Sequence, residues 1–267
     1  MVMMKNEEPA TMFATGVRPV IDAYLDEQSK QVRDYGNYWS ASSAGYCKRK
    51  VIFDRMQVTP TNIDARKTRV FEVGHIFHEW MQRITKDAGV TVAQEIELQE
   101  EELFIRGHID DLIKINDNLI LYDYKTAHSR SFTYKKGKPM SYYHMMQLGT
   151  YLYMLRQKDE YKELREARIL TISKDDLRMD EASLVWTDGL NKVIQEYWTD
   201  LNGFWNAKKL PPCSCAEYEK NGKSGIGFMA DAKYNPYHFQ GEPCSLTWYK
   251  IWKEGKANDY INKEASK

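Results

Sequence analysis

Two aspartates and one lysine are the residues of this sequence whose types and spacing best suit hydrolytic chemistry. Asp110 lies in an apolar stretch, and Asp123 follows it after 12 intervening residues. Lys125 comes two residues after Asp123, so both side chains share one face if this segment is a strand. Mg²⁺ binds one or two carboxylates and retains waters. The arrangement suits metal-assisted phosphodiester hydrolysis, in which the cation lowers the pKa of a water and the lysine orients that water or stabilises developing negative charge.

The same three residues would also fit an ion pair between strand-end acids and a lysine, and an isolated Asp-x-Lys motif is more often of that kind. Other polar residues nearby favour chemistry. His78 precedes the aspartates and follows Gly74 in a Gly-x-x-x-His spacing, and Gln147 and Tyr151 come after them. Each group lies on a stretch with helical spacing, in which residues four apart are neighbours on one face.

Strands must bring the two aspartates together. The helical spacing ends near Gly89, and the shorter apolar segments that follow predict strands over 91–98, 103–115 and 119–125. The tripeptide Asn-Asp-Asn at 116–118 joins the last two and is typical of a tight turn. Antiparallel pairing across this turn would place Asp110 and Asp123 in one region.

Helices are predicted on both sides of these strands. Ser40 or Ser42 could cap a helix that continues through Phe53. Apolar residues at helical spacing predict four more helices, over 17–35, 69–86, 141–156 and 184–205. A further strand is predicted over 167–173. The pattern indicates an α/β (α+β) fold with strands in the middle and helices at both ends.

Composition excludes several classes of protein. The 267 residues include 38 Lys+Arg and 38 Asp+Glu, so any DNA binding must depend on local basic patches. No apolar run approaches the roughly 20 residues of a membrane helix, and residues 1–10 lack a signal-peptide core. We therefore expect a cytoplasmic protein with no membrane partner, whose four cysteines are reduced, catalytic or metal-bound.

Local basic clusters occur at 48–50, 66–69 and 135–138. The third separates the Asp-Tyr-Lys segment from the Gln147 helix, at a place where a single strand of DNA could pass. Lysine contacts to phosphate there would make DNA binding strongly dependent on salt. Most such clusters are solvated faces, and this alternative stays open.

In this order, the motifs resemble the RecB-like branch of the PD-(D/E)XK nuclease superfamily. Its pattern is a helix histidine, then G-h-x-D, D-x-K and Q-x-x-x-Y. The resemblance implies a nuclease core at about 64–207, built as a central mixed sheet flanked by helices. It also implies one domain over 1–267, with a helical N-terminal segment at 1–60 and an irregular, cysteine-bearing C-terminal segment at 211–267.

The resemblance assigns a role to each motif residue. The implied metal ligands are His78, Asp110, Asp123 and the backbone carbonyl of Tyr124. Lys125 would be the catalytic lysine, acting with the two aspartates. Gln147 and Tyr151 would position the DNA strand or support the site. The implied cofactor is Mg²⁺ or Mn²⁺.

Four nearby residues are alternatives or exclusions. His75 is a rival ligand one helical turn before His78, although the spacing from Gly74 favours His78. Asp111 points to the opposite strand face from Asp110 in a regular strand and is left out. Glu95 and Glu97 could supply an acid from the first strand, which the family pattern does not require.

The cysteines resemble those of the iron–sulfur members of this branch, the AddB-type and CRISPR-associated exonucleases. There, four thiolates hold a [4Fe–4S] cluster that joins the two ends of the chain. Here the corresponding residues are Cys47, Cys213, Cys215 and Cys244. The C-terminal spacing departs from the family's C-x-x-C pattern, because Cys213 and Cys215 are two apart and Cys244 is distant. Zinc, or no metal, therefore remains an alternative.

The resulting prediction is a metal-dependent DNA exonuclease that hydrolyses single-stranded DNA or DNA ends. We expect it to act in recombination, repair, phage DNA metabolism or CRISPR adaptation. A chain of this length has no room for a helicase domain, so a partner helicase would supply any unwinding. The alternatives are a structure-specific endonuclease on the same fold and a catalytically silent DNA-end-binding module.

Overall fold

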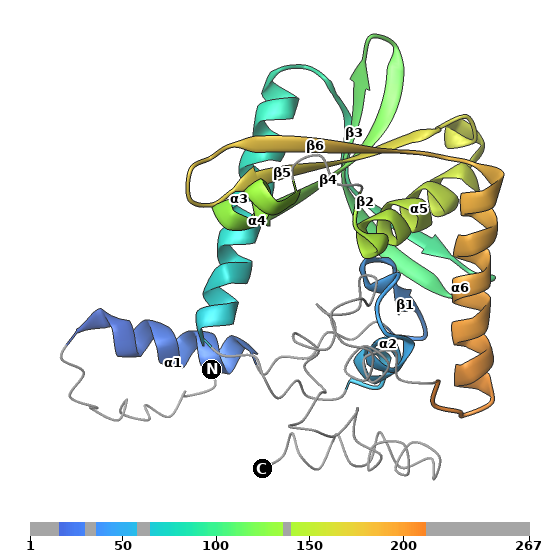
Figure 1. Ribbon diagram of the computed structural model, residues 1–267, viewed down its shortest axis with the longest axis horizontal. Coiled ribbons are helices and arrows are strands. Elements are labelled where there is room, and N and C mark those ends of the chain that lie inside the picture. The colour runs from blue at the N-terminus through green and yellow to red at the C-terminus, as the bar shows by residue number, and fades with distance from the viewer. Residues whose placement is uncertain (1–15, 30–35, 58–64, 136–139, 212–267) are drawn as a thin grey trace, which may run out of the picture.

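A six-stranded mixed sheet forms the centre of the computed structural model (Figure 1), which describes residues 16–29, 36–57, 65–135 and 140–211. The strands follow the order β1-β3-β4-β5-β6, and β2 pairs with β3. Their bounds are β1 (Trp39–Ser40), β2 (Thr91–Glu100), β3 (Ile105–Ile115), β4 (Asn118–Ala127), β5 (Glu166–Ser173) and β6 (Met179–Val185). The pairs β1–β3 and β4–β5 are parallel, and the other pairs are antiparallel.

Strand β3 has two partners on the edge away from β2. Its start pairs with β1, from Trp39 opposite Ile105 to Ser40 opposite Arg106. Its end pairs with β4, from Tyr122 opposite Asp111 to Asn118 opposite Ile115. Residues 107–110 lie between these two ladders with no strand partner on that edge among the described residues, so the sheet is open there.

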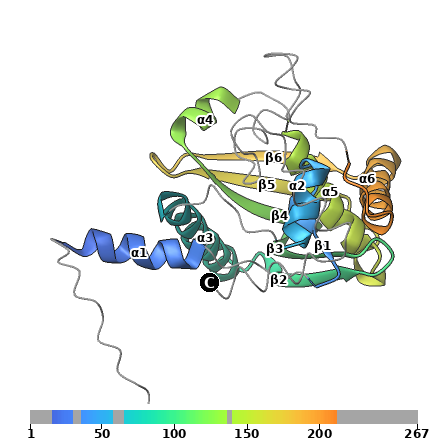
Figure 2. The same cartoon turned by 90° about the horizontal axis from the view of Figure 1, so that it is seen from below.

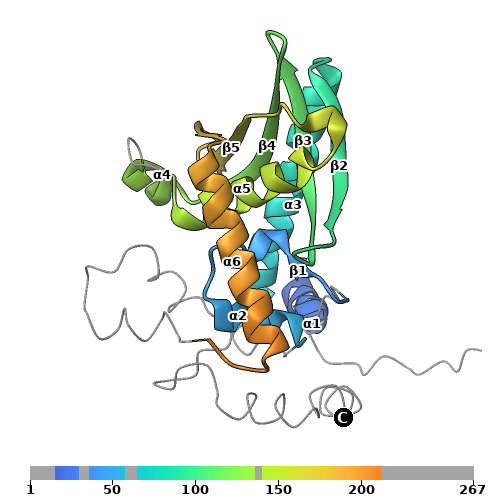
Figure 3. The same cartoon turned by 90° about the vertical axis from the view of Figure 1, so that its right-hand side faces the viewer.

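Helices cover both faces of the sheet (Figures 2 and 3). The α-helices are α1 (Val17–Ser29), α2 (Lys48–Arg55), α3 (Ala65–Asp87), α4 (Ser129–Lys135), α5 (Tyr142–Arg156) and α6 (Asp188–Asn206). Two short 3-10 helices are η1 (Ala41–Ser43) and η2 (Asp159–Tyr161). Helix α3 packs on one face through Met81, whereas α5 and α6 pack on the other through residues such as Leu148 and Ile194.

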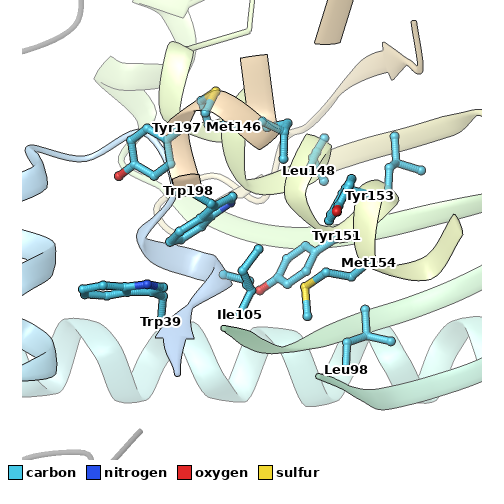
Figure 4. Packing of buried hydrophobic residues seen from close by; sticks show 14 of the residues in the cluster. Trp39, Leu98, Ile105, Met146, Leu148, Tyr151, Tyr153, Met154, Tyr197 and Trp198 are labelled. Carbon is cyan, nitrogen blue, oxygen red and sulfur yellow. The ribbon is translucent and has the colours of Figure 1, made fainter. Parts of the chain in front are cut away.

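The alternation of strand side chains explains this layering. In β4, Ile120, Tyr122 and Tyr124 join the smaller hydrophobic cluster beneath α3. Leu121 faces the opposite way and joins the larger cluster, which contains the buried side chains of α5 and α6. Figure 4 shows members of this larger cluster, including Tyr151.

Arg55 attaches α2 to the end of the core. Its guanidinium lies 4.1 Å from the centroid of the Trp39 ring and 4.4 Å from that of Trp205. The two indoles meet edge to face at 5.4 Å, so β1, α2 and α6 share one cation–π contact. Burial lowers the pKa of Arg55 to about 10.

The predicted fold class is confirmed: a mixed α/β sheet is flanked by helices. The predicted strands and the helices over 69–86 and 141–156 are present with small shifts at their ends. The turn between β3 and β4 has positive φ at Asn116 (49°) and Asp117 (65°), as a tight hairpin requires.

Several local predictions were wrong. Leu184 lies in β6 rather than at the start of the last helix, which begins only after the N-cap Thr187. Ser40 and Ser42 precede or lie in η1, and Cys47 stands at the N-cap of α2. The sequence did not predict β1, β6 or α4. None of the helices in the described ranges has the length and apolar character of a membrane-spanning segment.

Candidate active site

The predicted catalytic residues meet where β3 and β4 separate. The ladder between the two strands stops at Asp111 and Tyr122, while β4 continues to pair with β5 as far as Ala127. Beyond the separation, the backbone N–H of Tyr124 donates to Asp110 Oδ2 at 2.6 Å. The side chain of Asp110 therefore satisfies a main-chain donor of the neighbouring strand and lies against β4.

Asp123 is held between a cation and an amide. Lys125 Nζ lies 2.7 Å from Asp123 Oδ2, which confirms that the two side chains share a face of β4. Gln147 Nε2, on α5, donates to Asp123 Oδ1 at 2.9 Å and lies 3.4 Å from the hydroxyl of Tyr151. Helix α5 is placed for this contact by its N-cap, where Ser141 Oγ accepts from the backbone of His144.

Helix α3 contributes His78 and Gln82 from the other side. His78 Nδ1 lies 3.5 Å from Asp110 Oδ2. Gln82, one helical turn later, donates through Nε2 to the backbone carbonyl of Asp110 at 3.0 Å. His75 lies near Glu72 instead, with 3.8 Å between its Nδ1 and Glu72 Oε1. The structure thus brings His78 rather than His75 to the carboxylate.

Strand β2 is distorted beside the same carboxylate. The neighbours of Glu95 pair with Asp111 and Ile109, so Glu95 faces Asp110 across the ladder. Its φ of 49° is in the left-handed region, which is uncommon for a residue with a side chain. Gln82 Nε2 also donates to Glu95 Oε1. Glu97, the other acid considered on this strand, pairs with Arg106.

The electrostatics reflect burial of like charges. Burial, and next the charge of Asp123, raise the pKa of Asp110 to about 7. Burial lowers the pKa of His78, and the positive charge of Lys125 acts in the same direction. Burial acts to lower the pKa of Lys125, but the carboxylates of Asp123 and Asp110 together outweigh it, so that this pKa is raised.

These side chains line one open pocket of about 910 Å³. Its lining includes the predicted residues His78, Asp110, Asp123, Lys125, Gln147 and Tyr151. It also includes residues to which the sequence gave no role in the site: Ser40, Ser42, Glu79, Gln82, Arg106 and His108. A signal for Gln82 was available, because it lies four residues after His78 on the same helix face.

Gly107 is required where the sheet opens. A Cβ on this residue would lie 2.7 Å from Ala41 Cβ and 2.8 Å from Tyr151 Cε1. Real Cβ atoms do not approach that closely, so only glycine lets β3 pass beside η1 and α5. This contact gives a physical reason for the glycine of the Gly-x-x-Asp motif.

Asp111 lies outside the pocket lining and is fully buried. Its Oδ2 accepts hydrogen bonds from Thr85 Oγ1 at 2.6 Å, from Tyr124 Oη at 2.9 Å and from Gln94 Nε2 at 3.0 Å. These contacts differ from those of Asp110, which keeps an exposed fraction of 16% for its side chain.

The residues present fit a hard divalent cation. Mg²⁺ is commonly held by one or two carboxylates, with waters and substrate phosphates completing its shell. Asp110 and Asp123 supply such carboxylates, and burial, followed by the charge of Asp123, raises the pKa of Asp110. Among the described residues, no group of three His, Cys, Asp or Glu side chains could hold a metal ion. Waters and substrate phosphates would therefore have to complete the shell.

One of the four cysteines lies within the described residues. Cys47 is buried directly before α2. Cys213, Cys215 and Cys244 lie outside the described residues, as does most of the basic cluster at 135–138. In the first basic cluster, Lys48 pairs with Asp200 at 2.9 Å and Lys50 with Asp54 at 2.7 Å, so both contact acids of the protein itself.

Residues 64–196 match the model of the PD-(D/E)XK nuclease superfamily. This part of the chain is therefore a PD-(D/E)XK nuclease domain, as the motifs predicted. A stretch of 99 residues is 26% identical to an ATP-dependent helicase/nuclease subunit from Streptococcus equi subsp. zooepidemicus (strain MGCS10565). That match covers 36% of this chain and only 8% of the length of that relative.

Solved structures resemble this fold. The crystal structure of SSO0001 aligns with a TM-score of 0.50 at 17% identity, over 83% of this chain and 93% of that one. The crystal structure of an alkaline exonuclease (LHK-Exo) from Laribacter hongkongensis aligns with a TM-score of 0.46 at 15% identity, over 70% and 93% of the two chains. At these identities the likeness concerns the fold alone.

Proposed function

We propose that this protein is a divalent-metal-dependent deoxyribonuclease that degrades single-stranded DNA or DNA ends as an exonuclease. One observation carries the proposal: Lys125 and Gln147 hold the two oxygens of Asp123 at 2.7 and 2.9 Å, inside a pocket that Asp110 also lines. A nuclease-superfamily domain with this set of side chains has the groups that hydrolysis of a phosphodiester requires.

Each residue has a defined part in this proposal. Asp110 and Asp123 would supply the carboxylates that hold Mg²⁺ or Mn²⁺, and His78 and the carbonyl of Tyr124 would join them only once the side chains close on the ion, because the described residues hold no ready group of three such side chains. When bound, the ion supplies water activation and charge neutralisation. Lys125 keeps its proton, because the neighbouring carboxylates raise its pKa, and so presents a positive charge to the phosphate. Gln147 fixes Asp123, and Tyr151 supports Gln147 from one helical turn away.

The proposed substrate and partners follow from the motifs and the relative. The Q-x-x-x-Y element resembles that of RecB-like exonucleases, and the streptococcal relative is one subunit of a helicase/nuclease. We place the protein in the cytoplasm, in recombination, repair, phage DNA metabolism or CRISPR adaptation. We propose a helicase as a partner that unwinds duplex DNA for it.

A [4Fe–4S] cluster on Cys47, Cys213, Cys215 and Cys244 is part of the proposal. The burial of Cys47 beside the core suits a ligand that ties the N-terminal segment to a later part of the chain. Iron and sulfide analysis of anaerobically purified protein tests it, with four irons per chain expected for such a cluster. Stoichiometric zinc, or no bound metal, would refute the cluster without affecting the nuclease proposal.

The nuclease proposal is tested with end-labelled linear single-stranded DNA beside a circular single strand of the same sequence. With Mn²⁺ or Mg²⁺, the wild-type protein should shorten the linear strand progressively and leave the circle intact. Asp123→Asn should leave both substrates intact. Cleavage of the circle would indicate an endonuclease, and clean protein that binds DNA ends without cutting would indicate a silent binding module. Equal activity in wild type and variant would mean a contaminating nuclease.

A further inference from the structure

Two consecutive aspartates of β3, Asp110 and Asp111, accept hydrogen bonds from the two ends of Tyr124. The backbone N–H of Tyr124 donates to Asp110 Oδ2 at 2.6 Å, and its phenol donates to Asp111 Oδ2 at 2.9 Å. Tyr124 is itself the residue between Asp123 and Lys125. Any movement of its main chain would therefore displace both of the charged side chains that β4 contributes to the pocket.

The carboxylate of Asp111 is anchored to two further elements. Thr85 Oγ1, on α3, donates to its Oδ2 at 2.6 Å, and Gln94 Nε2, on β2, donates at 3.0 Å. Thr85 follows His78 by about two helical turns, which keeps the two residues on the same side of α3. The Asp111 cluster, consisting of Asp111, Thr85, Gln94 and Tyr124, therefore ties β2, β3, β4 and α3 together beneath the pocket.

The Asp111 cluster contains a buried carboxylate that lowers the free energy of unfolding relative to an apolar side chain. Asp111 is fully buried, and its Oδ1 has no hydrogen-bond partner among the described residues. Burying a carboxylate with one oxygen unsatisfied costs free energy, and an apolar side chain of similar volume is often more stable at such a place. A buried carboxylate that accepts all of its hydrogen bonds through one oxygen is suited to holding the donor side chains in fixed positions.

We infer that Asp111 is a positioning residue of the nuclease site. Its hydrogen bonds with the Tyr124 phenol and the Thr85 hydroxyl fix the positions of β4 and α3 relative to Asp110. It does not touch the substrate. It holds the main chain of Tyr124 so that Asp110, Asp123 and the Tyr124 carbonyl can bind one divalent cation. This inference rests on the proposed metal-dependent activity, and outer residues of this kind typically alter metal affinity or activity by about 10–100-fold.

The test compares Tyr124→Phe and Asp111→Asn with a matched control, Tyr122→Phe. Tyr122 lies two residues earlier on the same face of β4, and its phenol donates to Glu181 Oε1 at 2.5 Å, away from the pocket. Both Phe variants lose the hydrogen bond that a phenol donates on the same strand face, and Tyr122→Phe also loses a 3.5 Å bond that its hydroxyl accepts from Arg168 Nη1. Mn²⁺ binding is measured without DNA from the electron paramagnetic resonance signal of the free ion. Cleavage of labelled single-stranded DNA is measured as a function of Mn²⁺ concentration.

The expected result is that Tyr124→Phe and Asp111→Asn need about tenfold or more Mn²⁺ for half-maximal binding and cleavage, with the rate recovering at high Mn²⁺. Tyr122→Phe should keep the wild-type midpoint. If all three variants lose stability yet bind Mn²⁺ as the wild type does, Asp111 is only structural and the inference fails. If Asp111→Asn does not fold, Tyr124→Phe decides alone.

The two proposals fail separately. Wild-type protein that binds Mn²⁺ but cuts no DNA would refute the proposed function. The binding measurement would still decide the inference, because a weakened Mn²⁺ midpoint in Tyr124→Phe supports it and an unchanged midpoint overturns it.

Discussion

Asp110 and Asp111 are neighbours in sequence, yet their carboxylates have different surroundings. Asp110 faces the pocket, where one backbone N–H donates to it and His78 approaches to 3.5 Å. Asp111 is fully buried, and side chains from three other elements donate to it. Burial, and next the charge of the nearby Asp123, raise the pKa of Asp110, whereas Asp111 accepts hydrogen bonds from neutral donors.

The difference shows how one strand can serve two purposes. A carboxylate that must bind a cation has to keep its charge incompletely neutralised and accessible, and this costs stability in the absence of the cation. A carboxylate that must hold its neighbours can be enclosed by donors. The opening of the sheet between the β1 and β4 ladders makes the first environment possible beside the second.

The largest expected effect is the loss of DNA cleavage when Lys125 is removed from the pocket. Lys125→Ala should lower the rate of DNA cleavage by about 10²–10³-fold, because a positioned charge beside the phosphate contributes about 3–4 kcal/mol to the transition state. The measurement is the single-turnover rate on labelled single-stranded DNA. Lys114→Ala is the matched control, since Lys114 is an exposed lysine of β3 that pairs with Asp117 and lies outside the pocket lining. Equal losses in both variants would contradict the role of Lys125.

Gly107→Ala should disturb the packing of β3 against η1 and α5 beside the pocket. The added methyl group would overlap Ala41 and Tyr151, so we expect a loss of about 1–3 kcal/mol in the free energy of unfolding and weaker cleavage. Urea denaturation measures the first effect. Gly203→Ala in α6 is the control, because nothing lies within 4 Å of its Cβ position, and it should stabilise the protein by about 0.5–1 kcal/mol. An unchanged free energy of unfolding in Gly107→Ala would contradict the tight packing of Gly107 against Ala41 and Tyr151.

Replacing each aspartate by asparagine should give stability changes of opposite sign. In EDTA at pH 8, Asp110→Asn should stabilise the protein by about 1–2 kcal/mol, because it removes a buried charge next to Asp123. Asp111→Asn should destabilise it by about 1–3 kcal/mol, because the donors around it lose a charged acceptor. Changes of the same sign in urea denaturation would remove the distinction between the two sites.

The last expected effect concerns the dependence of stability on pH. A carboxyl whose pKa rises from 3.8 to about 7 on folding binds its proton more tightly in the native state. Its contribution to stability is complete below about pH 4 and is lost as pH rises through about 7. The charged groups facing Asp110 are Asp123, Lys125, Glu95 and His78. Metal-free wild type should therefore lose stability over this range, and thermal unfolding should show a flatter profile in Asp110→Asn; parallel profiles would contradict the assignment.

Short apolar segments predicted the parts of the fold that place the site. The strands that carry Asp110 and Asp123 are rich in apolar residues, and the hairpin turn has residues suited to positive φ. Strand β6 was missed because it is largely exposed, and its apolar residue Leu184 continued the spacing of the following helix. The N-cap Thr187, whose side chain accepts from the backbone of Leu190, was a boundary signal that could have separated them.

The site was predicted from motif order, and its supporting residues were not. Asp110, Asp123, Lys125, Gln147 and Tyr151 do line one pocket. Asp111 was set aside because strand alternation turns it from Asp110, and alternation carries no information about a phenol that arrives from another strand. The contacts of Gln94 and Thr85 likewise depend on how β2 and α3 pack on β3, which only the folded chain determines.

The most direct test measures cleavage of end-labelled single-stranded DNA by Asp110→Asn and Asp111→Asn across a range of Mn²⁺ concentrations. We expect Asp110→Asn to stay inactive at every concentration, whereas Asp111→Asn should regain a rate near that of the wild type when Mn²⁺ is high. Recovery of Asp110→Asn at high Mn²⁺, or a loss in Asp111→Asn that no Mn²⁺ concentration restores, would contradict the division between a metal-binding and a positioning carboxylate.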